Sequence, residues 1–372
     1  MLACATVLGA LWALSRSPAF VEDAYARRIS FQLGRALSIV SGLVPASLAE
    51  IALASLATYA LVAISVVTIH LIRRERSIVN VVLSGGLRAA TAAMIILSIF
   101  YLVWGLNYSR APLAARLGWT PIDRPANDDE ARQQTDEIAT LASQLIDATN
   151  QAYREALGTD DLGRPSERSG TAATLDATLE AAYASVPARL GLEPGVADGR
   201  GPAKPLLTSA LMNHFRLGGF YFPWTGEANY NRLVPAPDLP HAVAHEKAHQ
   251  RGIALEDEAN FVGYIACIVS DDPYLRYSGY LFGHQQLLGE LARRDLPRAR
   301  QLVGLRLKGV ERDVVFIRAF WRQYEGRAAV LSEAVNDTYL RSQGERRGMA
   351  AYAASRSLIV LFARHNGGRA TR

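Results

Sequence analysis

Five consecutive residues of this chain, His245-Glu246-Lys247-Ala248-His249, have the pattern HExxH. Side chains four residues apart in a helix lie on one face, with Cβ atoms about 5–6 Å apart. His245 and His249 can therefore bind one Zn²⁺ at about 2.0–2.1 Å each. Glu246, next to the first histidine, can then take a proton from a metal-bound water. The pattern predicts a site for metal-assisted hydrolysis.

The residues around the motif predict the helix that it requires. Asp238 suits the N-cap, Pro240 suits the first turn, and Gly252 suits the end of the helix. His241 lies one turn before His245 on the same face. We expect His241 to pack or to cap, because zinc sites of this type take only two histidines from the helix.

A catalytic zinc site needs a third protein ligand and keeps a fourth position open. After Gly252 the chain carries Glu256-Asp257-Glu258 at the start of a second predicted helix. Acidic side chains are favourable at any helix N-terminus. If this helix folds back beside the first, however, one of these acids can complete the site. We expect Glu256 to be the ligand and keep Glu258 as the alternative.

The first 110 residues differ in composition from the rest. Half of the whole chain is hydrophobic and its mean hydropathy is +0.06, which is high for a soluble protein. Residues 51–72 and 89–106 contain no charged side chain, and each approaches the length that crosses a hydrocarbon layer of about 30 Å. Residues 1–15 are apolar but shorter, and are either a further span or a signal-like segment. We therefore predict that residues 1–110 form a membrane anchor of about three transmembrane helices.

The connection between the two longer apolar runs carries Arg73, Arg74 and Arg76, with Arg88 at its end. This density of arginine favours the cytoplasmic side and would place the chain after Leu106 outside the cytoplasm. A net charge of +5 suits a protein near anionic lipid. No basic patch is interleaved with aromatic residues, so we expect the lipid bilayer as a partner and no nucleic acid.

Residues 111–372 have the size and polarity of one water-soluble, mostly helical domain. Apolar periodicity and glycine breaks predict helices near 128–157, 172–190, 277–294, 298–324, 327–341 and 347–364. One segment, 218–224, is β-prone and aromatic, and Thr225-Gly226 ends it with a turn. A strand beside the zinc helix could bind substrate backbone, although we expect its aromatic side chains to fill the core. Residues 227–229, which follow, are expected at the rim of a cleft.

Two further sets of side chains could do chemistry. Tyr277, Tyr280 and His284 recur at helical spacing, and one of them could stabilise an oxyanion. Such residues more often simply pack, so we select none of them. Cys4 and Cys267 lie in an apolar run and in a predicted helix, and we expect two small buried side chains rather than a disulfide.

Four segments of the chain resemble an uncharacterised bacterial membrane-protein family, catalogued as a domain of unknown function. They are YFPWTGEAN at 221–229, HEKAHQRG at 245–252, EDEANF at 256–261 and YSGY at 277–280. At the metal motif this family is similar to gluzincin metallopeptidases. In gluzincins the Glu of a Glu-x-x-x-Asp element binds zinc, and the later residue hydrogen-bonds a ligand histidine. Glu256 and Asn260 stand at these positions here, with Asn in place of Asp. The resemblance implies a membrane-anchored zinc hydrolase and gives no substrate.

Together these observations predict a mainly α protein of the bacterial cell membrane, with a zincin-like domain and a small β element at 111–372. His245, His249 and Glu256 would hold Zn²⁺, and Glu246 would act as general base in hydrolysis of a protein or peptide substrate. The alternative is a non-catalytic metal-binding sensory or scaffold protein. A structural zinc site, however, normally has four protein ligands and has no use for Glu246.

An intramembrane protease also uses HExxH, but within an apolar span. Lys247, Gln250 and Arg251 surround the motif here. These side chains are incompatible with lipid, so we predict that the motif lies outside the bilayer.

Overall fold

The structure is a computed structural model that describes all residues except 1, 74–76, 344, 346–347 and 349–353. It is mostly helical, with a small three-stranded sheet. The first part of the chain contains α1 (Leu2–Ser15), η1 (Phe20–Ser30), α2 (Phe31–Gly42), α3 (Leu48–Ile72), α4 (Ile78–Val103), η2 (Gly105–Ser109), α5 (Leu113–Arg116), α6 (Asp128–Leu157) and α7 (Ala172–Leu190). It continues with η3 (Pro194–Ala197), β1 (Lys204–Pro205), α8 (Ser209–His214), β2 (Gly219–Phe222), β3 (Glu227–Tyr230), α9 (Leu239–His249), α10 (Glu256–Val269) and α11 (Pro273–Arg294). The last helices are α12 (Leu296–Val303), α13 (Lys308–Arg322), α14 (Arg327–Ser342) and α15 (Ser355–His365).

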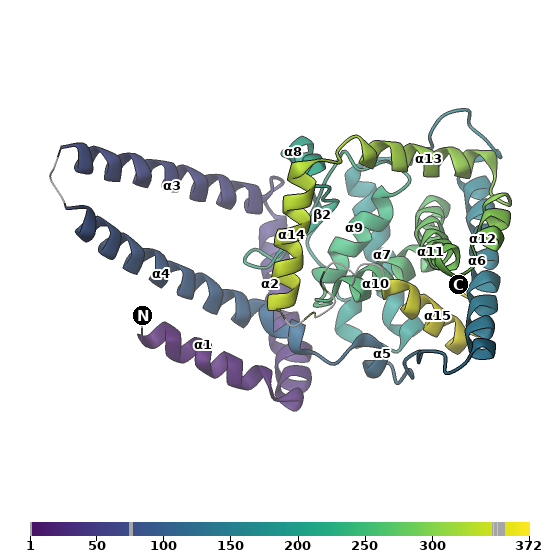
Figure 1. The fold of residues 1–372 in the computed structure, drawn as a ribbon, viewed down its shortest axis with the longest axis horizontal. Coiled ribbons are helices and arrows are strands. Elements are labelled where there is room, and N and C mark those ends of the chain that lie inside the picture. Colours follow the sequence, from purple (N-terminus) through teal and green to yellow (C-terminus); the bar gives the residue numbers. More distant parts are fainter. Residues whose placement is uncertain (1, 74–76, 344, 346–347, 349–353) are drawn as a thin grey trace.

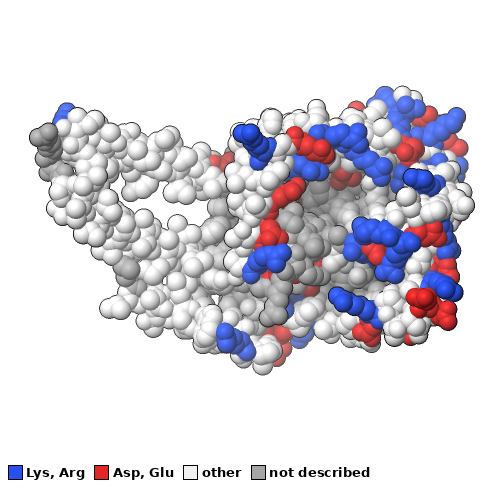
Figure 2. All heavy atoms as spheres, viewed as in Figure 1, with Lys and Arg blue, Asp and Glu red and all other residues white. Residues whose placement is uncertain are grey.

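Three apolar helices, α1, α3 and α4, project from the rest of the molecule (Figure 1), and we call them the arm. With 25 and 26 residues, α3 and α4 are long and apolar enough to cross a membrane. A third span results if α1 and the following helical segment Phe20–Gly42, bent by 117° at their junction, count as one. The prediction of about three apolar N-terminal helices is confirmed to this extent. Figure 2 shows the arm with almost no charge on the visible face.

The connection between α3 and α4 is shorter than predicted. Because α4 begins at Ile78, Arg88 lies inside this helix rather than at its start. Arg74 and Arg76 lie outside the described residues. The connection therefore contains at least one arginine fewer than predicted, because Arg88 is not part of it. The orientation of the chain, which was expected from these arginines, stays a prediction.

The segment between α1 and α3 packs on the body, by which we mean the structure from η2 to the C-terminus. Gly201 N donates a hydrogen bond of 3.2 Å to Ser38 Oγ in α2. Lys204 Nζ donates to the carbonyls of Ser41 and Ala46, at 2.8 and 3.0 Å. A domain boundary at residue 110 stays a prediction, but α2 is attached to the sheet of the body as well as to the arm.

The body is built around α10, which packs against α9, α7, α11 and α15, while α6 lies along α11. The bounds of α6 and α7 are those predicted, because local signals fix their ends. Asn127 caps α6 by accepting a hydrogen bond from Glu130 N, and Gly158 ends it in the left-handed conformation. The helix predicted at 298–324 is instead two helices, α12 and α13. The helix predicted at 347–364 falls partly outside the described residues, and α15 accounts for the rest.

The sheet has the strand order β1-β3-β2. The predicted extended segment forms β2, which pairs antiparallel with β3 and is an edge strand. β1 pairs with β3 in parallel. The expectation that residues 227–229 line a rim is wrong, because they form the central strand, where Glu227 is 1 % and Asn229 0 % exposed.

Candidate metal centre

The HExxH motif occupies the C-terminal half of α9, in the middle of the body (Figure 1). Val243, Ala244 and Ala248 are buried on the faces of α9 that pack against its neighbours. Asp238 is the N-cap residue as predicted, but its side chain makes no capping hydrogen bond. The chain turns at Gly252, which has φ +85°. The histidines therefore stand on a helix that is held by tertiary packing more than by its own caps.

The cationic residues next to the histidines are buried and paired with α7. Lys247 and Arg251 are both 0 % exposed. The ammonium of Lys247 lies 2.6 Å from Asp176 and 2.7 Å from Glu180, and Arg251 Nη2 lies 2.7 Å from Glu180. Burial alone would raise the pKa of Glu180, but the two cations lower it to about 2. These charges fix α9 against α7, since removing one partner would leave the other charged and buried.

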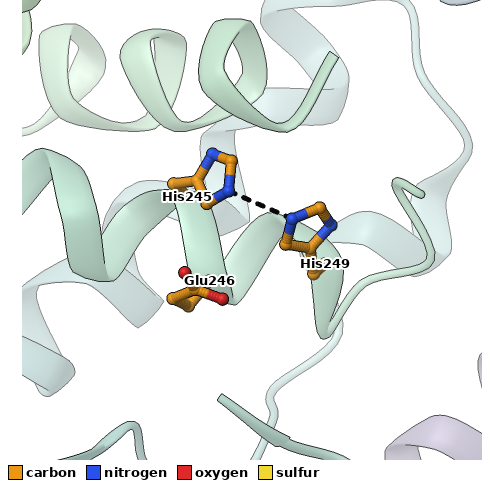
Figure 3. Close-up of side chains that lie close together, drawn as sticks. All are labelled: His245, Glu246 and His249. Carbon is orange, nitrogen blue, oxygen red and sulfur yellow. Dashed lines mark hydrogen bonds between the residues drawn. The ribbon is translucent and has the colours of Figure 1, made fainter. Parts of the chain in front are cut away.

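Three side-chain atoms converge on one point between α9 and α10. His245 Nε2 and His249 Nε2 are 3.0 Å apart (Figure 3). The carboxylate oxygen Oε2 of Glu256 lies 3.2 Å from the first and 3.5 Å from the second. Ligands bound tetrahedrally to zinc at about 2.0–2.1 Å stand about 3.3–3.4 Å from one another. The three separations fit a single zinc ion without rearrangement.

The close packing of α10 on α9 brings Glu256 to the histidines. At Gly263 of α10 an added Cβ would lie only 2.9 Å from His245 N, so the two helices approach as closely as their backbones permit. His249 Nδ1 lies 2.7 Å from the carbonyl oxygen of Ile253. A carbonyl can only accept, so Nδ1 carries a proton and Nε2 is the nitrogen that faces the site. Although burial lowers the pKa of His249, Glu256 raises it to about 9, so a bound metal ion would take the place of a proton on Nε2.

Glu258, the alternative ligand, points elsewhere. Its carboxylate accepts a hydrogen bond of 2.6 Å from Leu113 N and one of 3.0 Å from Arg116 Nη2. It thereby joins α10 to α5. Of the two glutamates considered from the sequence, only Glu256 lies with the histidines.

His241 and Asn260 interact with each other rather than with the three converging atoms. His241 Nε2 lies 3.1 Å from the backbone carbonyl of Asn260, and its ring stacks on Phe282 at 3.8 Å between centroids. Burial lowers the pKa of His241 to about 3. His241 is thus a packed histidine, as expected. The hydrogen-bond partner of a ligand histidine that the resemblance suggested at Asn260 is instead the carbonyl of Ile253.

Glu246 lies beside the two imidazoles. One potential ligand atom from each of His245, Glu246 and His249 falls within 4.8 Å of the others, and Figure 3 shows the three side chains together. Glu246 Oε2 is buried and has no hydrogen-bond partner within the described structure. Burial raises the pKa of this carboxyl to about 7, against the lowering effect of the histidines. Such a group can both accept and return a proton near neutral pH.

Comparison with protein families matches residues 25–360 to the family described as "Protein of unknown function (DUF3810)". The chain belongs to this family. The DUF3810 region includes α3, α4 and every residue of the candidate metal centre. No curated protein and no solved structure matches the chain. Membership of DUF3810 assigns no activity, so the argument for function depends on the geometry of the site.

The candidate metal centre of this DUF3810 protein opens into a cleft of about 1120 Å³. The lining residues come from four parts of the chain. They are Ala93, Ile96, Leu97 and Phe100 of α4, Trp104 and Tyr108 just after it, residues 215–224 around β2 in part, and Leu331, Ser332, Val335, Asn336, Tyr339 and Ser342 of α14, with Gln343. The cleft is also lined by the residues of the candidate metal centre, which are His245, Glu246, His249 and Glu256. The sequence predicted the residues of the metal centre and the strand β2. It did not predict that α4 and α14 line the cleft, because neither helix carries a recognisable motif.

The polar aromatic set considered for an oxyanion does not line this cleft. Tyr277 donates a hydrogen bond of 2.6 Å to Asp313, and His284 Nδ1 lies 2.9 Å from Thr149 Oγ1. The tyrosines that do line the cleft include Tyr108 and Tyr339, whose hydroxyls are 3.1 Å apart. Both cysteines are free thiols in the structure.

Proposed function

We propose that this protein is a membrane-anchored zinc peptidase. The observation that carries the proposal is the triangle formed by His245 Nε2, His249 Nε2 and Glu256 Oε2, with sides of 3.0, 3.2 and 3.5 Å. This is the spacing that three protein ligands of one zinc ion require, and it leaves a fourth position toward the cleft. A structural zinc site would present a fourth protein ligand instead.

The residues of the site would divide the chemistry among them. His245, His249 and Glu256 would hold Zn²⁺, which when bound supplies a Lewis acid and lowers the pKa of water. Glu246 would take a proton from water as the water oxygen bonds to the scissile carbonyl carbon. It would return that proton to the amine nitrogen as the C–N bond breaks. The buried, unpartnered Oε2 of Glu246 is free to accept this proton.

The edge strand β2 supports a peptide as the substrate. Gly219, Phe220 and Tyr221 line the cleft, and within the described part of the chain β2 pairs with β3 on one side only. The backbone N–H and C=O groups on its other side can bind an extended polypeptide as an additional strand. A substrate held in this way lies alongside Glu246, which is in contact with Gly219.

We further propose that α3 and α4 cross the membrane and that the body lies outside the cytoplasm. The two helices are apolar throughout most of their length, and their exposed large side chains would be stable in lipid.

The test uses the full chain in detergent, with a mixture of fluorogenic peptides as substrate. We expect one zinc per chain and hydrolysis that a hydroxamate inhibits. Glu246→Gln should retain zinc but lower kcat by about 10²–10⁴-fold, which is the contribution of a general base. Glu258→Gln is the matched control and should remain active, since Glu258 contacts α5. Full activity of Glu246→Gln would refute the mechanism. A fourth protein ligand detected by X-ray absorption would favour a non-catalytic metal-binding sensory or scaffold protein.

A further inference from the structure

One wall of the cleft belongs to the candidate span α4. Ala93, Ile96, Leu97 and Phe100 line the cleft and lie on one face of this helix, at intervals of three and four residues. At 1.5 Å per residue, about 20 residues cross a hydrocarbon layer of about 30 Å. Counted from Ile78, at the tip of the arm, these residues end near Leu97. With α4 crossing the membrane as proposed, the cleft would begin at the depth of the lipid chains.

Aromatic side chains line the path from this wall to the metal ligands. The ring of Phe100 lies 5.8 Å from that of Trp224, and Trp104 lies 4.6 Å from Tyr221. Trp104 also contacts the imidazole of His249, at 6.3 Å between centroids. An apolar segment could follow this path from the bilayer to the site without leaving an apolar surface.

The opposite wall, α14, has an apolar surface that nothing in the described structure covers. In Figure 1 α14 runs across the base of the arm. Val330, Leu331 and Val335 are 66, 62 and 61 % exposed. Three such side chains in adjacent turns are unfavourable in water but suit a helix that lies in the membrane interface. Because α14 also lines the cleft, the opening between α4 and α14 would face the bilayer in this placement.

The cleft has little to offer a charged substrate. Among the residues that the structure describes, its lining contains no Lys or Arg, and the carboxylates in it are those of Glu246 and Glu256. A charged side chain entering the cleft would lose hydration without gaining a partner. The lining favours an apolar segment, and the free edge of β2 favours an extended polypeptide over a lipid.

From these observations we infer that the substrate is the membrane-proximal segment of another membrane-anchored protein, which enters between α4 and α14 from the bilayer side. This inference rests on the proposed peptidase function. The site itself stays outside the lipid, because the segment reaches it along the cleft.

The test uses the full chain in lipid vesicles with model substrates in the same membrane. Each substrate is a single transmembrane helix that carries the same apolar fluorogenic segment. The segment follows the helix directly, or comes about 30 residues later on a Gly/Ser linker, which moves it about 30 Å further away on average. A third arm supplies the segment free in solution. We expect kcat/KM for the adjacent segment to exceed that for the distant one by roughly tenfold or more, because the linker dilutes the segment.

Equal cleavage of adjacent and distant segments, or faster cleavage of the free peptide, would overturn the inference and leave the peptidase function standing. No cleavage of any segment by zinc-loaded wild type would overturn both.

A second measurement does not depend on turnover. In Glu246→Gln, a photoreactive benzoylphenylalanine replaces Leu97, Val335 or, as control, Val315, which is 54 % exposed on α13 outside the cleft. We expect cross-links to the adjacent segment from positions 97 and 335 but not from 315. Cross-links from positions 97 and 335 to lipid alone would show that lipid fills the cleft and would overturn the inference.

Discussion

Gly219 is in contact with the carboxylate that we propose as the general base, so Gly219→Ala tests its placement directly. An added Cβ would lie 2.7 Å from both Cγ and Oε1 of Glu246. Ordinary contact begins at 3.4 Å, so the carboxylate must retreat by 3.4 − 2.7 = 0.7 Å. A catalytic group misplaced by about 1 Å costs about 10²-fold in rate. We therefore expect kcat to fall by roughly 30- to 100-fold, with zinc retained.

The same Cβ would lie 2.5 Å from the carbonyl oxygen of Asn229, so we also expect a loss of stability of about 1–3 kcal/mol from overpacking. The assay combines kcat on a fluorogenic peptide, zinc content by mass spectrometry and thermal unfolding of the full chain. Because the variant should stay folded at assay temperature, the loss of kcat can be separated from the loss of stability.

Gly218→Ala is the matched control. A Cβ there would meet only Ala242 Cβ, at 4.0 Å, so kcat should stay within about twofold of wild type, as for a substitution without a clash. Wild-type kcat in Gly219→Ala would refute the reasoning, and so would an equal loss in Gly218→Ala. Loss of zinc from Gly219→Ala would mean that the clash acts on the metal ligands instead of Glu246.

Three further predictions follow from buried charged groups. Glu256→Gln should weaken zinc binding by more than about 100-fold, which exceeds the cost of losing a group that only hydrogen-bonds a metal ligand. Glu258→Gln should leave the zinc affinity unchanged. Competition with a chelator measures both affinities, and equal values would exclude Glu256 as a ligand. Lys204→Met leaves the Glu227 carboxylate buried without its ammonium partner and should cost about 3–5 kcal/mol in unfolding free energy, part of which Lys204→Met with Glu227→Gln should restore. The pKa of Glu180 is lowered from 4.5 to about 2 in the folded protein, so its stabilising effect, on the order of 3 kcal/mol, is present above pH 4.5 and lost as the pH falls toward 2. The melting temperatures of wild type and Glu180→Gln should therefore converge between pH 5 and pH 2.5, and a constant difference would contradict this.

Local signals predicted those parts of the fold that depend on neighbouring residues. The ends of α6 follow from a capping asparagine and a glycine, Asn127 and Gly158. The strand β2 follows from an aromatic run before Thr225-Gly226. Where packing overrides local preference, the predictions were wrong. Residues 227–229 are polar enough for a rim, yet Glu227 is buried because Lys204 and the N-terminus of α3 surround it.

The polar flanks of the motif illustrate the same limit. Lys247 and Arg251 predicted that the motif lies outside the bilayer, and the structure shows both side chains fully buried against α7. The placement of the motif outside the bilayer stays a prediction, because charges that are buried and paired inside the protein do not contact lipid. Nothing in the order of residues reveals that Glu180 is the partner, 71 residues away from Arg251.

The sequence by itself determined the two histidines, the glutamate between them and the apolar arm, because HExxH places its side chains through the geometry of a single helix and a span requires only length and apolar composition. The choice between Glu256 and Glu258 needed the tertiary structure. These two residues are two positions apart in the chain, and only the packing of α10 on α9 decides which of them contacts the imidazoles. The cleft was also decided by the tertiary structure, since α4 and α14 are more than 200 residues apart and meet at the site only through the fold.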